Sequence, residues 1–327
     1  YTGSSYMKEI DFMEVGGFKV GQAEDSEGIT GITVMLMDKQ SPTGLDIRGG
    51  GPASRETPLL NPTADCKGLH AVILGGGSAF ALDAAGGVME YLEDRGIGLD
   101  VGITKVPLVC QSDIFDLGIG NPKSRPDREM AKKACENASY SSVQNGNHGA
   151  GMGATVGKYR GPESCMKGGI GTYAVELEGL KVGAMVVVNA CGDIYDIETN
   201  QVIAGCLNPD GSLVNDELAF FEDAARMMLA VRERTNTTIG IIVTNARFGK
   251  SELNKIASMA HNGYARAIRP VHTMMDGDSI YAVSTGGFEA DINLVGSLAA
   301  YVMGKAIGRG CQAAESLAGV KAVRDLQ

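Results

Sequence analysis

Strand-like and helix-like segments follow one another along almost the whole of this chain of 327 residues, and no Pro/Ser-rich linker divides them. An uninterrupted mixture of this kind favours one layered α/β domain over two separate domains. Apolar β-branched runs predict strands, and apolar residues spaced by three or four predict helices. We expect strands at 28–37, 69–74, 237–245 and 278–285, two more within 168–188, and helices at 79–93, 125–138, 216–233, 251–265 and 288–305.

Two of the predicted helices, 251–265 and 288–305, are apolar enough to pack against a sheet or a partner subunit. Short polar side chains accept hydrogen bonds from the free N–H groups where a helix starts. Asn215 or Asp216 is therefore expected to cap the helix that follows them, and Ser251 the next one.

Composition excludes several classes of protein. A net charge of −10 without a basic run argues against a nucleic-acid partner, and no apolar run approaches the ~18 residues of a membrane span. Seven cysteines without a CxxC pair fit neither a disulfide framework nor a zinc ribbon, which favours a reducing, cytoplasmic compartment. The four histidines lack HxxxH and HExxH spacing, so no metal site is expected. Residues 1–6, before Met7, look like an expression tag and lack the apolar core of a signal peptide.

The dipeptide Asn236-Thr237 stands between a predicted helix and a predicted strand. A cut between these two residues would give Thr237 a free α-amino group beside its own hydroxyl, so that one residue carries both nucleophile and base. An α-amino group with a pKa of about 7.7–8.0 suits base chemistry near neutral pH. Taken alone, however, the dipeptide is more simply a turn that enters a strand.

Two glycine-rich segments suggest nucleotide binding at first sight. In the segment 75–80, a dinucleotide-binding fingerprint would need glycine where Phe80 stands, so a tight strand-to-helix turn or the wall of a substrate pocket fits better. In the segment 149–158, Lys158 is followed by Tyr159 rather than Ser or Thr, which excludes a phosphate-binding loop. Lys158 is either a solvated surface residue or a buried cation that lowers the pKa of a nearby amine.

Polar residues follow two of the apolar segments. Asn189 ends the run 184–188, where an amide is either a capping residue or a hydrogen-bond donor to an oxyanion. Asp276 and Asp278 flank a glycine, which is typical of a hairpin turn. Such a pair can also hold a divalent metal, for which no further ligands are evident, or orient Thr237 and its new amine.

Several short segments occur in an order that one family uses. The chain resembles the L-aminopeptidase/D-esterase family of self-cleaving peptidases, which includes β-aminopeptidases and nylon-oligomer hydrolases. The resemblance extends from residue 28 to the C-terminal helix. The segments that carry it are 28–31, 48–57, 74–85, 114–118, 153–158, 187–190 and the strand after Thr237.

This resemblance implies a four-layer αββα sandwich, similar to the N-terminal-nucleophile hydrolases but with a different strand connectivity. Family members cut themselves before a Ser or Thr, which here places the cut after Asn236. A single domain, 1–327, would become a large chain, 1–236, and a small chain, 237–327, that stay folded together. The family also suggests a homo-tetramer of cleaved pairs and needs no cofactor.

The resemblance also assigns catalytic roles. Thr237 Oγ would attack the substrate amide with its own freed amine as base, and Asn189 would donate a hydrogen bond to the oxyanion. Lys158 would keep that amine neutral and nearby carboxylates ionised, while Asp278, with Asp276, would orient Thr237. Gly76, Gly77 and Ser78 would line the substrate entrance.

The Asn-Thr junction and the two downstream aspartates look most like the nylon-oligomer hydrolase branch. The substrate would be a small peptide, an amino amide or ester, or an oligoamide, and the residues do not distinguish these. Many relatives carry small apolar residues where this chain has Val-Cys-Gln-Ser-Asp at 109–113, so the wall of the substrate pocket is expected to differ from theirs. The main alternative is an acyltransferase of the ornithine acetyltransferase type, followed by a nicotinamide oxidoreductase and a non-catalytic binding protein.

Overall fold

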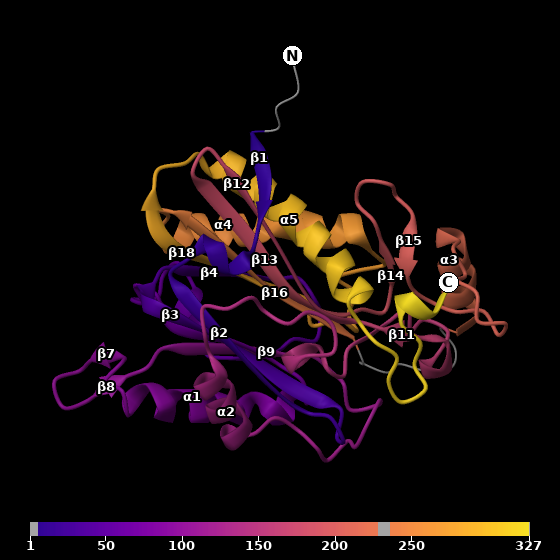
Figure 1. Cartoon of the computed structure of the whole chain (residues 1–327), viewed down its shortest axis with the longest axis horizontal. Helices are drawn as coiled ribbons and strands as arrows, with labels where there is room; N and C mark the ends of the chain where they lie inside the picture. The colour runs from indigo at the N-terminus through magenta and orange to yellow at the C-terminus, as the bar shows by residue number, and fades with distance from the viewer. Residues whose placement is uncertain (1–5, 228–235, 327) are drawn as a thin grey trace.

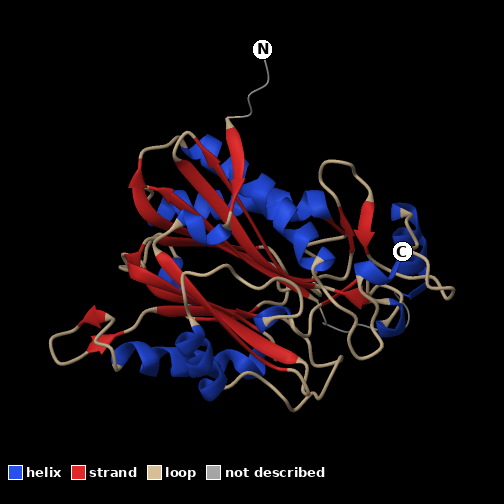
Figure 2. Ribbon diagram, in the orientation of Figure 1, coloured by secondary structure: helices blue, strands red, loops and turns tan. Residues whose placement is uncertain are grey.

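Two β-sheets lie face to face between two layers of helices in the computed structural model, which describes residues 6–227 and 236–326 (Figure 1, Figure 2). The six-stranded sheet has the order β1 (Met7–Ile10), β12 (Gly169–Leu177), β13 (Leu180–Asn189), β16 (Thr237–Ala246), β18 (Ser279–Phe288) and β4 (Thr43–Ile47). The five-stranded sheet has the order β2 (Phe18–Asp25), β3 (Thr30–Ser41), β6 (Leu69–Gly75), β9 (Val109–Asp113) and β5 (Ala53–Arg55).

Helices cover the outer face of each sheet (Figure 2). The apolar faces of α4 (Lys250–Ala267) and α5 (Ile292–Gln312) pack on the six-stranded sheet. Those of α1 (Ala84–Glu93) and α2 (Arg128–Asn137) pack on the five-stranded sheet. The layer order is therefore helix, sheet, sheet, helix, which confirms the predicted αββα sandwich.

Smaller elements lie around these layers. The structure describes a three-stranded sheet, β15 (Val202–Ala204), β14 (Asp193–Tyr195) and β17 (Ile268–Arg269), and the pairs β7 (Leu99–Asp100) with β8 (Lys105–Val106) and β10 (Thr155–Val156) with β11 (Met166–Lys167). Helix α3 (Glu217–Met227) lies near β15 and is joined to β17 by an ion pair between Glu217 and Arg269 (Figure 1). Short 3₁₀ helices occupy Phe12–Val15, Thr57–Leu60, Ser78–Asp83, Gly149–Gly151, Pro162–Ser164 and Val323–Leu326.

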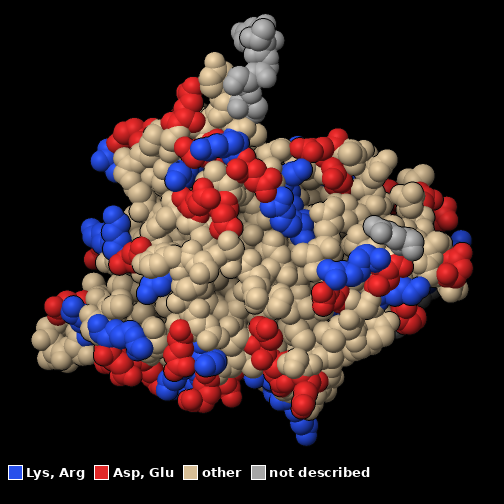
Figure 3. Space-filling view, in the orientation of Figure 1, with Lys and Arg blue, Asp and Glu red and all other residues tan. Residues whose placement is uncertain are grey.

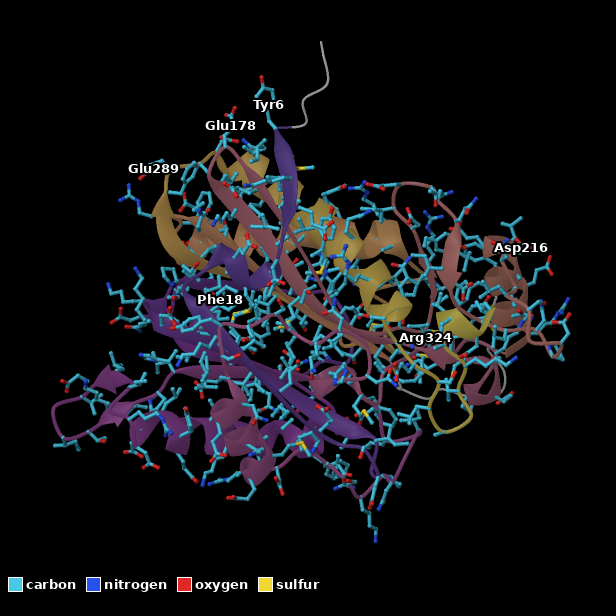
Figure 4. All side chains as sticks on the ribbon, in the orientation of Figure 1. Tyr6, Phe18, Glu178, Asp216, Glu289 and Arg324 are labelled. Carbon is cyan, nitrogen blue, oxygen red and sulfur yellow. The ribbon has the colours of Figure 1, made fainter. Side chains whose placement is uncertain are left out.

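Side chains of both sheets fill the layer between them, where Figure 4 places Phe18. Alternation along β16 directs Ile239 and Ile241 into this layer and Ile242 toward the helices. Thr237 lies two residues before Ile239, so the two side chains point to the same face of the strand. The side chain of Thr237 is therefore directed into the space between the sheets, at the end of the strand. The predicted nucleophile is therefore placed by the pleat of a buried strand.

Charged residues of both signs are interspersed on the face seen in Figure 3, around a broad uncharged band. This face offers no continuous basic surface to a phosphate backbone. Within the described ranges, no helix is both long enough and apolar enough to cross a bilayer.

The structure contains a strand at each predicted position, but three helices start later than predicted. The helix predicted at 125–138 begins at Arg128, after the capping residue Asp127. The helix predicted at 79–93 begins with a 3₁₀ turn, a common start for a helix, and α1 follows only at Ala84. The chain leaves β6 through left-handed conformations at Gly77 and Ser78, with φ of +82° and +55°. The helix predicted at 288–305 begins at Ile292, because β18 continues to Phe288.

The predicted cap Ser251 is wrong, whereas one of the two caps predicted for α3 is present. Helix α4 begins at Lys250, and the carboxylate of Glu252 accepts the N–H of Gly249 at 2.8 Å, so Ser251 lies inside the first turn. At α3, Asp216 accepts the N–H of Leu218 at 2.9 Å. The remainder of that predicted helix, 228–233, lies outside the described residues.

Candidate active site

The N-terminal end of β16 brings the predicted catalytic residues together. Thr237, the first residue of β16, lies directly opposite Asn189, the last residue of β13, in the antiparallel ladder. On its other side β16 pairs with β18, and Asp276 and Asp278 immediately precede β18. A β-bridge joins Asn236 to Asp276. Residues from three separate parts of the chain therefore meet at one end of the six-stranded sheet.

The hydroxyl of Thr237 lies against the bond that it is expected to attack. Its Oγ1 donates a hydrogen bond to the carbonyl oxygen of Asn236, and the N–H of Gly277 donates to the same oxygen at 3.2 Å. A Cβ at Gly277 would lie 2.7 Å from Thr237 Oγ1, so only glycine leaves room there. The predicted nucleophile and a backbone donor thus converge on one peptide carbonyl, where an attack would develop negative charge.

The two aspartates hold different partners. Asp278 Oδ1 accepts the N–H of Thr238 at 2.8 Å, so this carboxylate fixes the backbone beside Thr237. Asp276 Oδ2 instead accepts the N–H and the hydroxyl of Thr273, at 2.8 and 2.5 Å. Burial, followed by the charge of Asp278, raises the pKa of Asp276 to about 6. Asp276 therefore changes its charge close to neutral pH.

Lys158 and Asn189 form the other wall of the site. Lys158 Nζ donates to Asn189 Oδ1 at 2.9 Å, and the N–H of Thr155 donates to the same oxygen at 3.0 Å. With Oδ1 held by two donors, Asn189 donates from Nδ2, to the carbonyl of Phe115 at 3.0 Å. This is the end of the amide that an oxyanion donor must use. Burial lowers the pKa of Lys158 to about 8, so its ammonium is also poised near neutral pH.

The residues predicted to line the substrate entrance connect to the site through one intervening segment. The N–H of Ser78 donates to the carbonyl of Ile114 at 2.9 Å, next to the Phe115 carbonyl that Asn189 binds. The N–H of Gly77 donates to Asp116 at 2.8 Å. A Cβ at Gly76 would lie 2.1 Å from the same carboxylate of Asp116. These contacts explain the glycines as a tight turn around Asp116, while their role at the entrance stays a prediction.

A glycine loop, residues 49–51, contacts the backbone of the two aspartates. The N–H of Gly51 donates to the carbonyl of Asp276 at 2.8 Å, and the N–H of Gly49 to that of Asp278 at 3.2 Å. A Cβ at Gly49 would lie 2.3 Å from the Asp276 oxygen. The three consecutive glycines at 49–51 were the available signal for this close backbone approach.

Two histidines next to Asp278 are not predicted by the sequence, because their spacing matches no metal-ligand motif. His272 Nδ1 lies 2.9 Å from Asp278 Oδ2, and His261 lies next to His272. Throughout residues 6–227 and 236–326, no group of three or more His, Cys, Asp or Glu side chains is arranged to hold a metal ion. All seven cysteines are buried and outside disulfide bonds.

Comparison with known proteins connects this geometry to a family. Residues 11–324 match the family described as peptidase family S58. An uncharacterized aminopeptidase of Mycobacterium bovis is 34% identical over 342 aligned positions, which cover 96% of each chain. A 6-aminohexanoate-oligomer endohydrolase of Paenarthrobacter ureafaciens is 31% identical over 279 positions, which cover 85% of this chain and 76% of that protein.

Solved structures share the fold at low sequence identity. An L-aminopeptidase D-Ala-esterase/amidase from Ochrobactrum anthropi, described as a variant of the Ntn-hydrolase fold, superposes with a TM-score of 0.71 at 18% identity, covering 94% of this chain and 87% of that one. A β-aminopeptidase from Burkholderia sp. superposes with a TM-score of 0.67 at 17% identity, covering 97% and 92%. The similarity covers the whole sandwich rather than one half of it.

Proposed function

This chain belongs to peptidase family S58 and hydrolyses amide bonds, and on that premise we propose that Thr237, freed by a cut of the Asn236–Thr237 bond, is its nucleophile. The observation that carries the proposal is the convergence on the Asn236 carbonyl oxygen. The Thr237 hydroxyl and the Gly277 N–H both donate to that oxygen. Both residues of the bond are buried, each with 4% of its surface exposed, so the reaction begins in a site closed to bulk water.

These contacts support self-cleavage by the following steps. Thr237 Oγ1 attacks the carbonyl carbon of Asn236, and the Gly277 N–H stabilises the oxyanion that forms. The bond from this carbon to the Thr237 nitrogen breaks, the hydroxyl proton passes to that nitrogen, and an ester remains between Asn236 and Thr237 Oγ1. Water hydrolyses the ester, which leaves a carboxylate on Asn236 and a free α-amine on Thr237.

Substrate hydrolysis uses the same nucleophile. Thr237 Oγ1 attacks the substrate carbonyl, and the new α-amine accepts the hydroxyl proton through water and returns it to the departing amine. Asn189 donates to the oxyanion, and the ammonium of Lys158 favours the neutral form of the α-amine. Asp278 positions the strand through Thr238, Asp276 holds the loop beside it, and water releases the acyl group.

We extend the proposal to the substrate class, on the basis of the names of the relatives and of the Asn236-Thr237 junction. One relative is named for 6-aminohexanoate oligomers and another as an aminopeptidase, so short oligoamides and amino-terminal peptide bonds are the two candidates. A panel of 6-aminohexanoate oligomers, β-peptides and aminoacyl amides, assayed with the cleaved protein, distinguishes them. A preference for the oligomers would place this chain in the nylon-oligomer branch.

The assembly belongs to the same proposal: a cytoplasmic homo-tetramer of cleaved pairs. The hairpin of β7 and β8 projects from the body of the molecule and exposes Leu99, Val101 and Ile103, with 44%, 49% and 95% of their surface accessible (Figure 1). Exposed apolar residues on a projecting element are typical of subunit contacts. Light scattering of the cleaved protein measures the assembly, and a monomer would contradict it.

The decisive test is the fate of Thr237→Ala. Intact-mass measurement of the wild-type protein should show two fragments, the smaller beginning at Thr237, whereas Thr237→Ala should remain one inactive chain. Thr237→Ser, which keeps the hydroxyl, is the matched control and should still cleave. A cleaved and active Thr237→Ala protein would overturn the assignment of the nucleophile.

A further inference from the structure

Asp278 Oδ1 accepts the N–H of Thr238, and a chain of hydrogen bonds begins at the other oxygen, Oδ2. Asp278 Oδ2 accepts the backbone N–H of His272 at 2.9 Å and lies 2.9 Å from His272 Nδ1. His272 Nε2 lies 3.2 Å from His261 Nδ1, and His261 Nε2 lies 2.9 Å from the carbonyl oxygen of Asp46. Two imidazole rings therefore link the carboxylate beside Thr237 to the backbone of β4.

Counting hydrogens along this line fixes the charge of His272. The Asp46 carbonyl can only accept, so His261 Nε2 carries a hydrogen. The His261 side chain is fully buried, and burial, assisted by the neighbouring His272, lowers the pKa of His261 to about 4. His261 faces a neutral carbonyl and His272 faces the carboxylate of Asp278, so a positive charge shared by the two rings belongs on His272. His261 Nδ1 then accepts a hydrogen bond from His272 Nε2.

The other nitrogen of His272 must also donate. Asp278 already accepts the N–H of Thr238 and that of His272, as an ionised carboxylate does. Its Oδ2 therefore requires a hydrogen on His272 Nδ1 as well. With a hydrogen on each ring nitrogen, His272 is an imidazolium, paired with a buried aspartate of which 1% is exposed.

Three carboxylates and one guanidinium lie around the two imidazole rings. Helix α4 contributes His261 and Tyr264, whose ring centroids lie 4.6 and 5.8 Å from that of His272. Strand β4 and the residue after it contribute Asp46 and Arg48, which form an ion pair with each other. The loop before β18 contributes Asp278 and, beyond it, Asp276.

We propose that His272 is a positioning residue of the Thr237 site, an imidazolium oriented by His261 that neutralises Asp278 and fixes the carboxylate that anchors Thr238. The proposal rests on the proposed function, because it explains how the nucleophile is held. It also explains how two buried carboxylates can lie two residues apart before β18. Asp278 forms an ion pair with His272, whereas burial raises the pKa of Asp276.

The protonation state is tested without any reaction. In ¹⁵N-histidine-labelled Thr237→Ala chain, nitrogen NMR at pH 7 should show both ring nitrogens of His272 protonated, with the signals assigned by His272→Gln. His70 is the internal control, because its Nδ1 accepts the N–H of Leu108 at 3.0 Å and it should be neutral, with the hydrogen on Nε2. A neutral His272 at pH 7 would overturn the proposal, whatever becomes of the cleavage hypothesis.

The positioning role is tested by kinetics. His272→Gln removes the positive charge, so the carboxylate pair should hold its proton to higher pH, and the acid limb of the kcat profile should move upward in pH. We expect kcat to fall roughly 10–100-fold, with KM within about twofold, as for other partners that orient a catalytic group. His148→Gln, at an exposed contact with Glu24, is the matched control and should match the wild type. An unshifted acid limb in folded His272→Gln would leave His272 with only a structural role.

Discussion

Lys158 and Lys167 lie nine residues apart, and burial lowers the pKa of both, to about 8 and about 7, but their surroundings differ. Lys158 is partly buried and donates to a side chain, Asn189, at 2.9 Å. Lys167 is fully buried. Its ammonium donates to three backbone carbonyls, those of Gly151, Ala154 and Gly168, at 3.4, 2.7 and 3.2 Å.

The difference predicts that the charge of Lys158 serves the chemistry of the site, whereas the charge of Lys167 serves folding. A cation bound to a site amide can influence a neighbouring amine or carboxylate, because its field reaches the reacting groups. A cation surrounded by carbonyls holds loop and strand together, and removing it leaves those oxygens without a donor. Depressed lysine pKa values therefore do not by themselves identify a catalytic residue, whereas the partners of the ammonium do.

Of the two lysine variants, Lys158→Met should have the larger effect on activity. Removing the ammonium should lower kcat and the self-cleavage rate by roughly 10²–10⁴-fold, the range seen when a group that stabilises the charges of a reaction is removed. Stopped time courses followed by intact mass measure cleavage, and circular dichroism checks the fold. Lys167→Met is the matched comparison and should keep both rates within about threefold. Equal losses in the two variants would remove the distinction between these lysines.

The pH dependence of self-cleavage should follow the groups of the Lys158 region. The rate should rise as Asp276 loses its proton through about pH 6 and fall as Lys158 loses its proton through about pH 8. Lys167→Met should keep both the rise of the rate near pH 6 and its fall near pH 8. The residual activity of Lys158→Met should lack the fall near pH 8. Measurements at half-unit steps from pH 5 to 10 decide this, and a basic limb that survives in Lys158→Met would assign it to another group.

The smallest effect on activity, but a clear one on stability, is expected for Lys167→Met. Three carbonyl oxygens lose their donor, which should lower the free energy of unfolding by roughly 1–3 kcal/mol. In the wild type, Lys167 releases its proton near pH 7 in the folded state and near 10.4 in the unfolded state, so the unfolded state binds more protons between these values. Stability should therefore rise with pH across this window, by a larger amount in the wild type than in the variant.

Urea unfolding of the uncut Thr237→Ala chain at pH 7 and pH 9, with and without Lys167→Met, measures that slope. Lys8→Met, at an exposed ion pair with Glu176, is the control and should leave the slope unchanged. Identical slopes with and without Lys167 would show that this lysine keeps its proton in the fold.

Local patterns in the sequence predicted one layered α/β domain, whereas the αββα sandwich and the membership of the site were predicted through the resemblance to a family. Apolar alternation located β16, and the order of Lys158, Asn189 and the two aspartates placed them in one family site. The strand register then brings Asn189 opposite Thr237, as their positions at strand ends allow.

What the sequence did not predict depends on contacts between distant segments. The glycines at 49–51 indicate a close backbone approach, but no local pattern shows that its partner is Asp276. Nor does any pattern show that Asp278 accepts the N–H of Thr238 rather than contacting Thr237 itself. His272 takes a left-handed φ of +61°, which is uncommon for a residue with a side chain and gives no signal in the sequence. Such arrangements arise from tertiary packing and emerge only in the folded chain.

The position of β16 has a consequence for the molecule after cleavage. The small chain would supply β16 and β18, which lie between β13 and β4 inside the six-stranded sheet, together with the two helices that cover it. The two chains would therefore be held together by strand pairing on both sides of an inserted pair. Unfolding would become a dissociation, so the melting temperature of the cleaved protein should rise with its concentration, as that of an obligate heterodimer does.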